Sequence, residues 1–276
     1  MSSSFPYRKY SVEELLDEYE KLRNYQPEKK IRRRNVGYKS SNAFFQYERM
    51  NTPAGRRISN IEYWKKNRRN IIKFQENYEK NMDLFGIIQF LNHSSAQFPP
   101  NVAIELYHMF KAEKILDPFA GWGDRCIAAM AKDLDYTGID SNRNLKIPYR
   151  EMINFYPHES KVKFINKPVE KVDLSKLDFN FVLTSPPFWN QKEVITEKYH
   201  GMTYFDYEEF MDNVFIPTVL ICATKAEWSC YYIPKHMAEY VSQKTGIKWT
   251  KRLGYKYSGN KKYQVFSVYC LKKLND

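Results

Sequence analysis

Two short turns hold the residues best suited to chemistry. The first, residues 117–123, reads DPFAGWG, and the second, residues 184–189, reads TSPPFW. Glycines in the first turn would let the backbone approach a ligand closely, and the helix expected after it would offer free N–H groups. In the second turn two prolines fix the backbone, so Ser185 Oγ and the Pro186 carbonyl become rigid acceptors. Such acceptors could bind both protons of an exocyclic amine and turn its lone pair toward an electrophile.

A carboxylate follows the first turn at a distance typical of a ribose-binding site. Asp140 lies 17 residues after Gly123, at the end of the next apolar segment, where it could accept both ribose hydroxyls. A dinucleotide site would predict the same features. However, Cys126 stands where the third glycine of G-x-G-x-x-G belongs. The pattern therefore favours a nucleoside ligand without a pyrophosphate, and a plain tight turn is the alternative.

Alternating strand and helix patterns would position these turns. We expect strands at 114–119, 136–140, 161–165, 180–184, 227–233, 248–257 and 263–271. One helix is expected before the first strand, at 102–111, and others between later strands, at 124–132, 145–155, 207–224 and 235–245. This alternation predicts a doubly wound α/β sheet of mostly parallel strands. The last two strands, joined by Ser258-Gly259-Asn260, form a predicted hairpin, so the final strand runs antiparallel among parallel neighbours.

Positive charge is concentrated before this pattern begins. Residues 21–80 hold 17 basic and 5 acidic residues, whereas residues 101–250 hold 18 basic and 20 acidic ones. A basic segment of this kind suits a polyanion, because each neutralised phosphate releases counterions. We therefore expect residues 1–90 to form a basic, partly helical extension that contacts nucleic acid, and residues 91–276 to form the catalytic domain. A generally basic solvated surface is the alternative.

Within this extension, residues 11–24 are predicted to form an amphipathic helix, with Ser11 as N-cap and Glu14 completing a capping box. Aromatic rings that could stack on bases are interleaved with the charges, at Tyr38, Phe44, Phe45, Tyr47, Tyr63 and Trp64. Some of these rings must belong to a core. The side chains expected to contact the substrate's phosphates are Arg56, Arg57, Lys65 and Arg68.

The composition excludes several classes of protein. Of the 276 residues, 43% are hydrophobic and 16% aromatic, too many for a coreless disordered chain. No apolar run reaches eighteen residues and no secretion signal begins the sequence, so we expect an intracellular protein without a membrane partner, whether cytoplasmic, nucleoid-associated or in a virus-infected host cell. The four cysteines and five histidines show no zinc spacing, so we expect no metal and buried, reduced thiols. The oligomeric state is not indicated.

Together with residues 97–101, QFPPN, the two turns resemble motifs X, I and IV of the S-adenosylmethionine-dependent amino-methyltransferases of DNA. The resemblance covers residues 92–271 and implies a Rossmann-like class I methyltransferase fold with S-adenosylmethionine as cofactor. It also implies cofactor contacts from Phe98, Pro99, Asp117, Phe119, Ala120, Gly121, Gly123 and Asp140. The adenine side is left open between Asn166, Pro168 and Glu170. The target base would be held by Ser185, Pro186, Pro187, Phe188 and Trp189.

Serine before the two prolines resembles the N4-cytosine enzymes of this family, whereas aspartate or asparagine there resembles the N6-adenine enzymes. We therefore expect methylation of cytosine N4 in DNA, with the base flipped into a pocket. The alternatives are adenine N6 in DNA, adenine N6 or guanine N2 in RNA, and a nucleic-acid-binding module without turnover. C5-cytosine methylation is excluded, because that family's nucleophile lies in a Pro-Cys pair and none of the 13 prolines precedes a cysteine.

Overall fold

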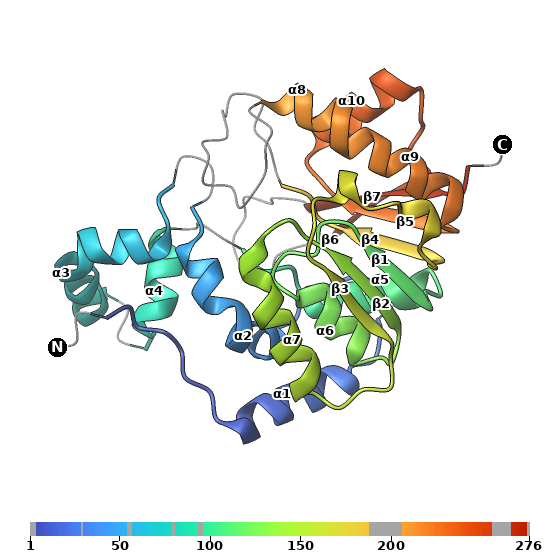
Figure 1. The fold of residues 1–276 in the computed structure, drawn as a ribbon. Helices are drawn as coiled ribbons and strands as arrows, with labels where there is room; N and C mark the ends of the chain where they lie inside the picture. The colour runs from blue at the N-terminus through green and yellow to red at the C-terminus, as the bar shows by residue number, and fades with distance from the viewer. Residues whose placement is uncertain are drawn as a thin grey trace.

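A seven-stranded sheet forms the centre of the protein (Figure 1). The computed structural model describes residues 4–28, 30–53, 57–78, 81–92, 96–187, 206–255 and 266–274. The strands are β1 (Lys114–Asp117), β2 (Asp135–Ile139), β3 (Val162–Ile165), β4 (Phe181–Thr184), β5 (Trp228–Tyr232), β6 (Lys251–Tyr255) and β7 (Phe266–Lys272). Each starts and ends within a few residues of its predicted bounds.

The strand order is β3-β2-β1-β4-β5-β7-β6. Strands β1 to β5 pair in parallel, and β7 runs antiparallel to both of its neighbours, β5 and β6. The predicted mostly parallel sheet with a terminal antiparallel hairpin is therefore confirmed, and the fold is Rossmann-like and of the class I methyltransferase type. The predicted turn of the hairpin, residues 258–260, lies outside the described residues.

Helices cover both faces of the sheet. The first face is covered by α5 (Pro100–Met109), α6 (Asp124–Met130) and α7 (Lys146–Phe155). The second is covered by α8 (Tyr207–Phe210), a π-helical turn (Met211–Phe215), α9 (Ile216–Lys225) and α10 (Lys235–Thr245). The π-helical turn interrupts the single helix predicted for residues 207–224. Short 3₁₀ turns occupy Arg143–Leu145, Val169–Lys171 and Leu174–Lys176.

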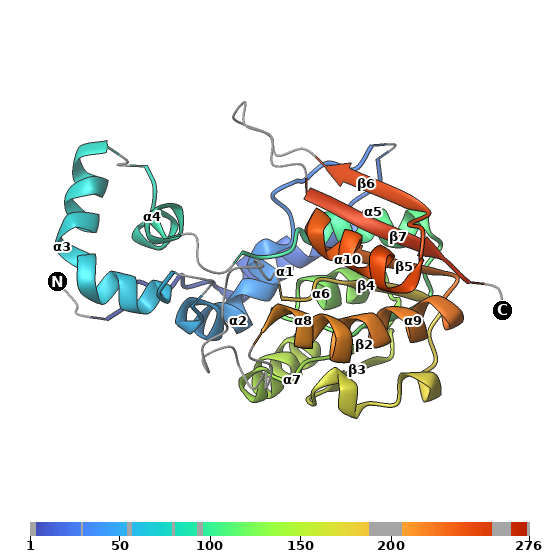
Figure 2. The same ribbon diagram turned by 90° about the horizontal axis from the view of Figure 1, so that it is seen from above.

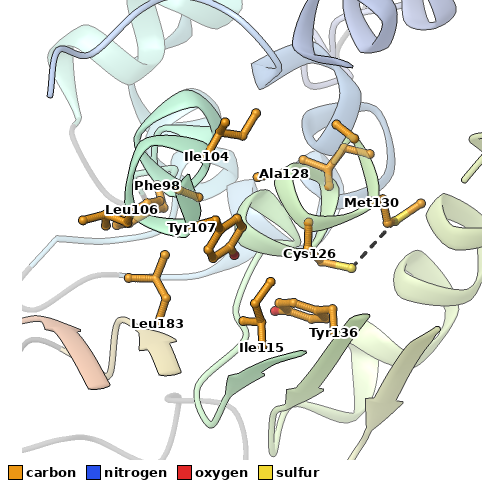
Figure 3. Packing of buried hydrophobic residues seen from close by; sticks show 14 of the residues in the cluster. Phe98, Ile104, Leu106, Tyr107, Ile115, Cys126, Ala128, Met130, Tyr136 and Leu183 are labelled. Carbon is orange, nitrogen blue, oxygen red and sulfur yellow. Dashed lines mark hydrogen bonds between the residues drawn. The ribbon is translucent and has the colours of Figure 1, made fainter. Parts of the chain in front are cut away.

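Alternation along the central strands explains this layering. In β1, Ile115 belongs to the first hydrophobic cluster and Leu116 to the second, because successive side chains of a strand point to opposite faces. Figure 3 shows the first layer, in which Tyr107 and Cys126 from the helices pack over Ile115 and Tyr136 from the strands. These buried contacts pack α5 and α6 against β1 and β2.

The first 90 residues divide between two hydrophobic clusters. Helices α1 (Val12–Arg23) and α2 (Tyr38–Asn51) join the main core through Leu15, Tyr19, Leu22 and Phe45. The Ser11–Glu14 capping box predicted for α1 is confirmed. Helices α3 (Asn60–Tyr78) and α4 (Leu84–Leu91) form a separate cluster around Trp64 and lie beyond α2 from the sheet (Figures 1 and 2). The two-domain division at residue 90 stays a prediction.

All four cysteines are buried and carry free thiols, as the sequence predicted. Within the described ranges, no helix combines the length and the apolar character that crossing a membrane requires. The same residues contain no group of three or more His, Cys, Asp or Glu side chains that could hold a metal ion.

Candidate cofactor and substrate site

The two turns that carry the candidate chemistry leave neighbouring strands. Strand β1 pairs in parallel with β4, and β2 lies on the other side of β1. The chain therefore reverses its strand order at β1, and in open α/β sheets ligands bind outside the carboxyl ends of the strands at such a point. DPFAGWG begins with the last residue of β1 and TSPP with the last residue of β4, so both lie at this edge.

Thr184 joins the two turns directly. Its hydroxyl donates a hydrogen bond to Asp117 Oδ1 over 2.7 Å and accepts one from the Phe119 N–H over 3.0 Å. The loop after β1 therefore cannot move relative to the residue before Ser-Pro-Pro without losing both bonds. This role of Thr184 was not predicted from the sequence, although its position immediately before Ser185 could have indicated it.

Asp117 is fully buried and its carboxylate is held by several donors. Arg125 approaches it with Nε at 2.6 Å and Nη2 at 3.3 Å, and the Tyr136 hydroxyl lies at 2.7 Å. Together with Thr184, these groups make Asp117 part of the scaffold beneath the glycine turn. Its predicted contact with a cofactor stays a prediction. Arg125 and Tyr136 were missed because only the folded sheet brings them to Asp117.

The carbonyl groups of the glycine turn are also fixed. Arg125 Nη2 donates to the Phe119 carbonyl over 2.6 Å and to the Ala120 carbonyl over 3.2 Å. The Tyr149 hydroxyl donates to the same Ala120 carbonyl over 3.0 Å. Ala120 is itself buried, and its N–H donates to the Ile139 carbonyl over 2.9 Å. The turn is thus held in place before any ligand binds.

The two glycines are required for different reasons. Gly121 and Gly123 both adopt left-handed backbone conformations, with φ of +58° and +74°. Among the described residues, and apart from its chain neighbours, the nearest atoms to a Cβ at Gly121 would be Arg125 Nη2 and the Phe119 carbonyl oxygen, both at 4.0 Å, an ordinary van der Waals distance. A Cβ at Gly123 would lie 2.5 Å from Phe45 Cε2, so here helix α2 packs directly against the backbone.

Asp140 closes the other side of the glycine turn. Its carboxylate accepts the N–H of Gly121 over 2.9 Å and the N–H of Asn142 over 2.9 Å, one on each oxygen. Burial raises its pKa above the ordinary value, and these two backbone donors act in the opposite direction. Each carboxylate oxygen keeps a second acceptor position, so both ribose hydroxyls of a nucleoside could be bound.

Asn166 supports this turn from the neighbouring strand end. Its side-chain amide donates to the carbonyl groups of Asp140, over 2.9 Å, and of Asn142, over 2.8 Å. Asn166 therefore has a positioning role at the Asp140 turn. Whether it, Pro168 or Glu170 contacts an adenine stays open.

The QFPPN segment lies against the glycine turn, as expected from the resemblance. The Phe98 N–H donates to Asp124 Oδ2 over 3.1 Å, and Gln97 Nε2 donates to Asp124 Oδ1 over 2.9 Å. The Phe98 ring centre is 5.5 Å from that of Tyr232, at the end of β5. Pro99 is buried and forms the N-cap of α5. The structure thus brings these residues to the same sheet edge.

The predicted target-base residues are described only in part. Ser185 and Pro187 are half-buried and Pro186 is buried, directly after β4. Phe188 and Trp189 lie outside the described residues. The described part of this turn is nevertheless fixed next to Asp117 through Thr184.

Two of the basic residues predicted to contact phosphate do not lie beside these turns. Lys65 and Arg68 belong to α3, which α2 separates from the sheet (Figure 2). Lys65 is exposed, as are Lys66, Arg69 and Lys73 of the same helix. Arg68 is half-buried with its guanidinium 5.7 Å from the Trp64 ring centre, and Arg57 is exposed just before α3. Arg56 lies outside the described residues.

Two of the aromatic residues considered for base stacking cannot serve that purpose. Phe45 is fully buried beneath Gly123, and Trp64 belongs to the α3–α4 cluster. Tyr47 is the contrasting case, because 58% of its surface is exposed on α2. Helical periodicity explains the difference, since Phe45 and Tyr47 lie on opposite faces of one helix.

The site residues fit an adenosyl-type ligand. Asp140 offers acceptors for two hydroxyls, and Gly121 has no side chain and a left-handed backbone conformation, so a ligand could approach its backbone. The half-buried Ser185 lies at the same edge, one residue after Thr184. This arrangement can hold a nucleoside beside a second planar group.

No protein-family model matches the sequence, and no curated protein matches it. Among similar solved structures is the Pyrococcus abyssi tRNA (uracil-54, C5)-methyltransferase in complex with S-adenosyl-L-homocysteine, with 13% identity, a TM-score of 0.41, and coverage of 62% of this chain and 37% of that chain. The M. jannaschii tRNA m1G37 methyltransferase has 18% identity, a TM-score of 0.40, and coverage of 65% and 52%.

A third is the SAM-dependent methyltransferase from Agrobacterium tumefaciens, with 12% identity, a TM-score of 0.45, and coverage of 66% of this chain and 64% of that chain. In each of these three comparisons, the aligned part covers less than two thirds of the other chain. Likeness at this level does not assign a substrate, and the fold assignment follows from the strand order.

Proposed function

We propose that this chain is an S-adenosylmethionine-dependent methyltransferase that methylates the exocyclic amine of a nucleobase in a polynucleotide. The observation that carries the proposal is the pair of hydrogen bonds by which Thr184 holds the DPFAGWG turn against the TSPP turn. They hold the two turns together at one sheet edge, which supports a nucleoside site beside a pair of rigid acceptors. A methyl donor and an accepting amine must be aligned closely for direct transfer.

On the donor side, the cofactor would supply an electrophilic methyl group when bound. Asp140 would accept hydrogen bonds from its ribose hydroxyls, using the acceptor positions that the backbone N–H groups leave available. Gly121 would let the ligand approach the backbone, and Phe98 and Pro99 would border the same site from the start of α5. These residues bind and orient, and they exchange no proton.

On the acceptor side, Ser185 Oγ and the Pro186 carbonyl would accept the two protons of the target amine. This directs the nitrogen lone pair toward the methyl group and restricts rotation of the amine. The amine releases its extra proton after transfer, so no dedicated base is required. Phe188 and Trp189 are proposed to stack on the base, which would be flipped out of its helix.

The proposed target base is cytosine N4 in DNA, because serine before the two prolines, here Ser185, resembles the N4-cytosine enzymes. Adenine N6 in DNA is the next choice. Adenine N6 or guanine N2 in RNA is the alternative, because exposed cations on α3 would bind the phosphates of either polymer. Two of the solved structures named above are tRNA methyltransferases, but at their TM-scores they do not choose between the polymers.

Labelled methyl transfer tests the proposal. The purified chain is incubated with labelled S-adenosylmethionine in three separate reactions, which contain duplex DNA, single-stranded DNA or RNA. The nucleosides from each reaction are then analysed by mass spectrometry. N4-methylcytosine from DNA is expected, whereas N6-methyladenine or N2-methylguanine from RNA would favour the alternative. Binding of nucleic acid without transfer in any pool would favour a non-catalytic module.

Two serine variants make this experiment specific. Ser185→Ala should reduce transfer strongly, because it removes one of the two proposed acceptors. Ser175→Ala is the matched control, since the hydroxyl of that exposed serine donates a hydrogen bond to Asp173 on the surface. Equal rates for the two variants would remove the proposed role of Ser185.

A further inference from the structure

We propose that helix α2, which precedes the methyltransferase core in the sequence, forms one wall of the cofactor site, and that Asp124 is the positioning residue that connects it. This inference rests on the proposed function, since it concerns the site at which S-adenosylmethionine would bind. It changes the expected role of the N-terminal extension, which the sequence analysis assigned to nucleic-acid contact alone.

Asp124 links three segments, α2, residues 97–98 and α6, and these contacts are called the junction below. It is the first residue of α6, directly after Gly123, and is only 3% exposed. Its carboxylate accepts Ser41 Oγ over 2.5 Å from α2, together with the bonds from Gln97 and Phe98 already described. Gln97 Nε2 also lies 3.1 Å from Ser41 Oγ, so the three segments are linked to one another.

All of these groups donate to the carboxylate. The Ser41 hydroxyl, the Gln97 amide and the Phe98 N–H each bring a hydrogen to Asp124. An ionised carboxylate accepts such a set without conflict, whereas an amide in its place would bring its own hydrogens against a donor. The junction therefore requires an acceptor-only side chain at position 124, which asparagine does not provide despite its similar shape.

The same face of α2 makes two further contacts with the site. Phe45 packs beneath Gly123, and its ring centre is 4.9 Å from that of Tyr149, whose hydroxyl holds the Ala120 carbonyl. Glu48 Oε2 accepts the Asn144 side-chain amide over 3.1 Å, close after the Asp140 turn. Ser41, Phe45 and Glu48 follow one another at i, i+4 and i+7, so they share one helix face.

This face reaches both ends of the proposed cofactor site, the glycine turn at one end and the turn after β2 at the other. The glycine turn therefore depends on α2 for its position, even though α2 ends 66 positions before Asp117, the first residue of that turn. Changes at the junction should weaken the binding of the cofactor more than the binding of a polynucleotide to α3.

Calorimetry with S-adenosyl-L-homocysteine on the full chain tests this inference. Ser41→Ala and Asp124→Asn should each weaken binding by about tenfold or more, because each disturbs hydrogen bonds to a buried charge. Affinity for a labelled oligonucleotide, measured by fluorescence anisotropy, should stay within about twofold. The Ser41→Ala/Asp124→Asn double variant should bind no more weakly than Asp124→Asn alone, because the two residues act as one pair.

Ser175→Ala is again the matched control. Ser175 Oγ lies 2.5 Å from the exposed Asp173, and the substitution removes no hydrogen-bond partner of Asp124. Should Asp124→Asn fail to fold, Gln97→Ala, which removes a single half-buried donor, replaces it. Binding of S-adenosyl-L-homocysteine by the junction variants at wild-type strength would overturn the inference and leave the proposed function standing. Failure of the folded wild-type chain to bind it would overturn the proposed function and this inference together.

Discussion

Thr184 Oγ1 lies 2.7 Å from Asp117 Oδ1, and this hydrogen bond joins the carboxyl ends of β4 and β1. Asp117 begins the turn proposed to hold the methyl donor, and Thr184 precedes the turn proposed to hold the target amine. This hydroxyl, together with the parallel pairing of β1 with β4, thus holds the two turns of the proposed site at a fixed spacing.

Replacing Thr184 by valine should reduce methyl transfer and destabilise the fold. Valine keeps the shape of threonine but leaves Asp117 and the Phe119 N–H without this partner, at a cost of about 1–3 kcal/mol for a buried group. Thr184→Ser retains the hydroxyl and should retain most of both properties. Urea unfolding and labelled transfer measure the two effects, and a valine variant as stable and active as the serine variant would show that the hydroxyl is dispensable.

Replacing Arg125 by methionine should destabilise the protein more strongly. Arg125 and Asp117 form a buried ion pair with Nε 2.6 Å from Oδ2, so the substitution leaves a buried carboxylate without its charged partner. Removing one member of such a pair costs about 3–5 kcal/mol. Urea unfolding should show this loss, with Arg23→Met as the control, because the Arg23–Asp133 pair is about one-third exposed. Equal losses for the two variants would contradict the role given to Arg125.

Binding of S-adenosyl-L-homocysteine should weaken as the pH falls through about 6. Burial raises the pKa of Asp124 to about 6, against the lowering effects of Ser41, Gln97, Arg49 and Arg125. Below this pH the carboxylate takes up a proton, which brings a hydrogen against the donors that surround it. Calorimetry between pH 5 and 8 should show the effect in the wild type and a flatter profile in Asp124→Asn. Parallel profiles would exclude Asp124 as the titrating group.

The same raised pKa determines how Asp124 affects stability. Its ordinary value is 3.8, so between about pH 4 and pH 6 the native state holds a proton that the unfolded state has lost. Burial favours the protonated carboxyl in the native state. The free energy of unfolding therefore contains the full contribution of Asp124 below this pH range, and this contribution, about 3 kcal/mol, is lost as the pH rises through the range. The difference in unfolding free energy between wild type and Asp124→Asn should change over this interval, and a constant difference would contradict the assignment.

The exposed cations of α3 should contribute to polynucleotide affinity through phosphate contacts. Lys65, Arg69 and Lys73 are exposed on this helix, opposite the buried Trp64 and Ile71. Replacing the three by alanine should weaken binding and reduce the dependence of log K on log salt by up to about 3. The control replaces Lys161, Lys163 and Lys171, which are equally exposed near β3. An identical salt slope in both triple variants would show that α3 does not contact phosphate.

Substitutions on α3 test phosphate contact more specifically than a deletion of the first 40 residues would. Such a deletion would remove Leu15, Tyr19 and Leu22, which are buried in the main core beside the sheet. Loss of these side chains would expose apolar surface and destabilise the whole fold. A weakened affinity would then say nothing specific about phosphate contacts.

Much of the sheet could be predicted from the sequence because its signals are local. Apolar segments of strand length, separated by helical periodicity, fixed the positions of all seven strands, and the final hairpin placed β7 between β5 and β6. The π-helical turn at Met211–Phe215 was not predictable, because its apolar pattern is that of an ordinary helix. Glycine positions indicated the turn now proposed to bind the cofactor for the same local reason.

The contacts that hold the site together could not be predicted, because they join residues far apart in the sequence. Ser41 and Asp124 are 83 positions apart, and Thr184 and Asp117 are 67 apart. The resemblance named Asp117 as a cofactor residue, whereas its buried carboxylate is surrounded by protein donors. Likewise, the charge of residues 21–80 indicated an extension that contacts nucleic acid, and the apolar face of α2 places part of this extension within the core.

The most direct test of the central claim is mass spectrometry of nucleosides after incubation with S-adenosylmethionine that carries a deuterated methyl group. DNA and RNA are supplied together with the wild-type chain, Ser185→Ala or Asp140→Ala. The account predicts a deuterated methyl group on an exocyclic nitrogen of one base, with much less in either variant. A label on a ring carbon or a ribose oxygen, or its absence from every nucleoside, would contradict the account.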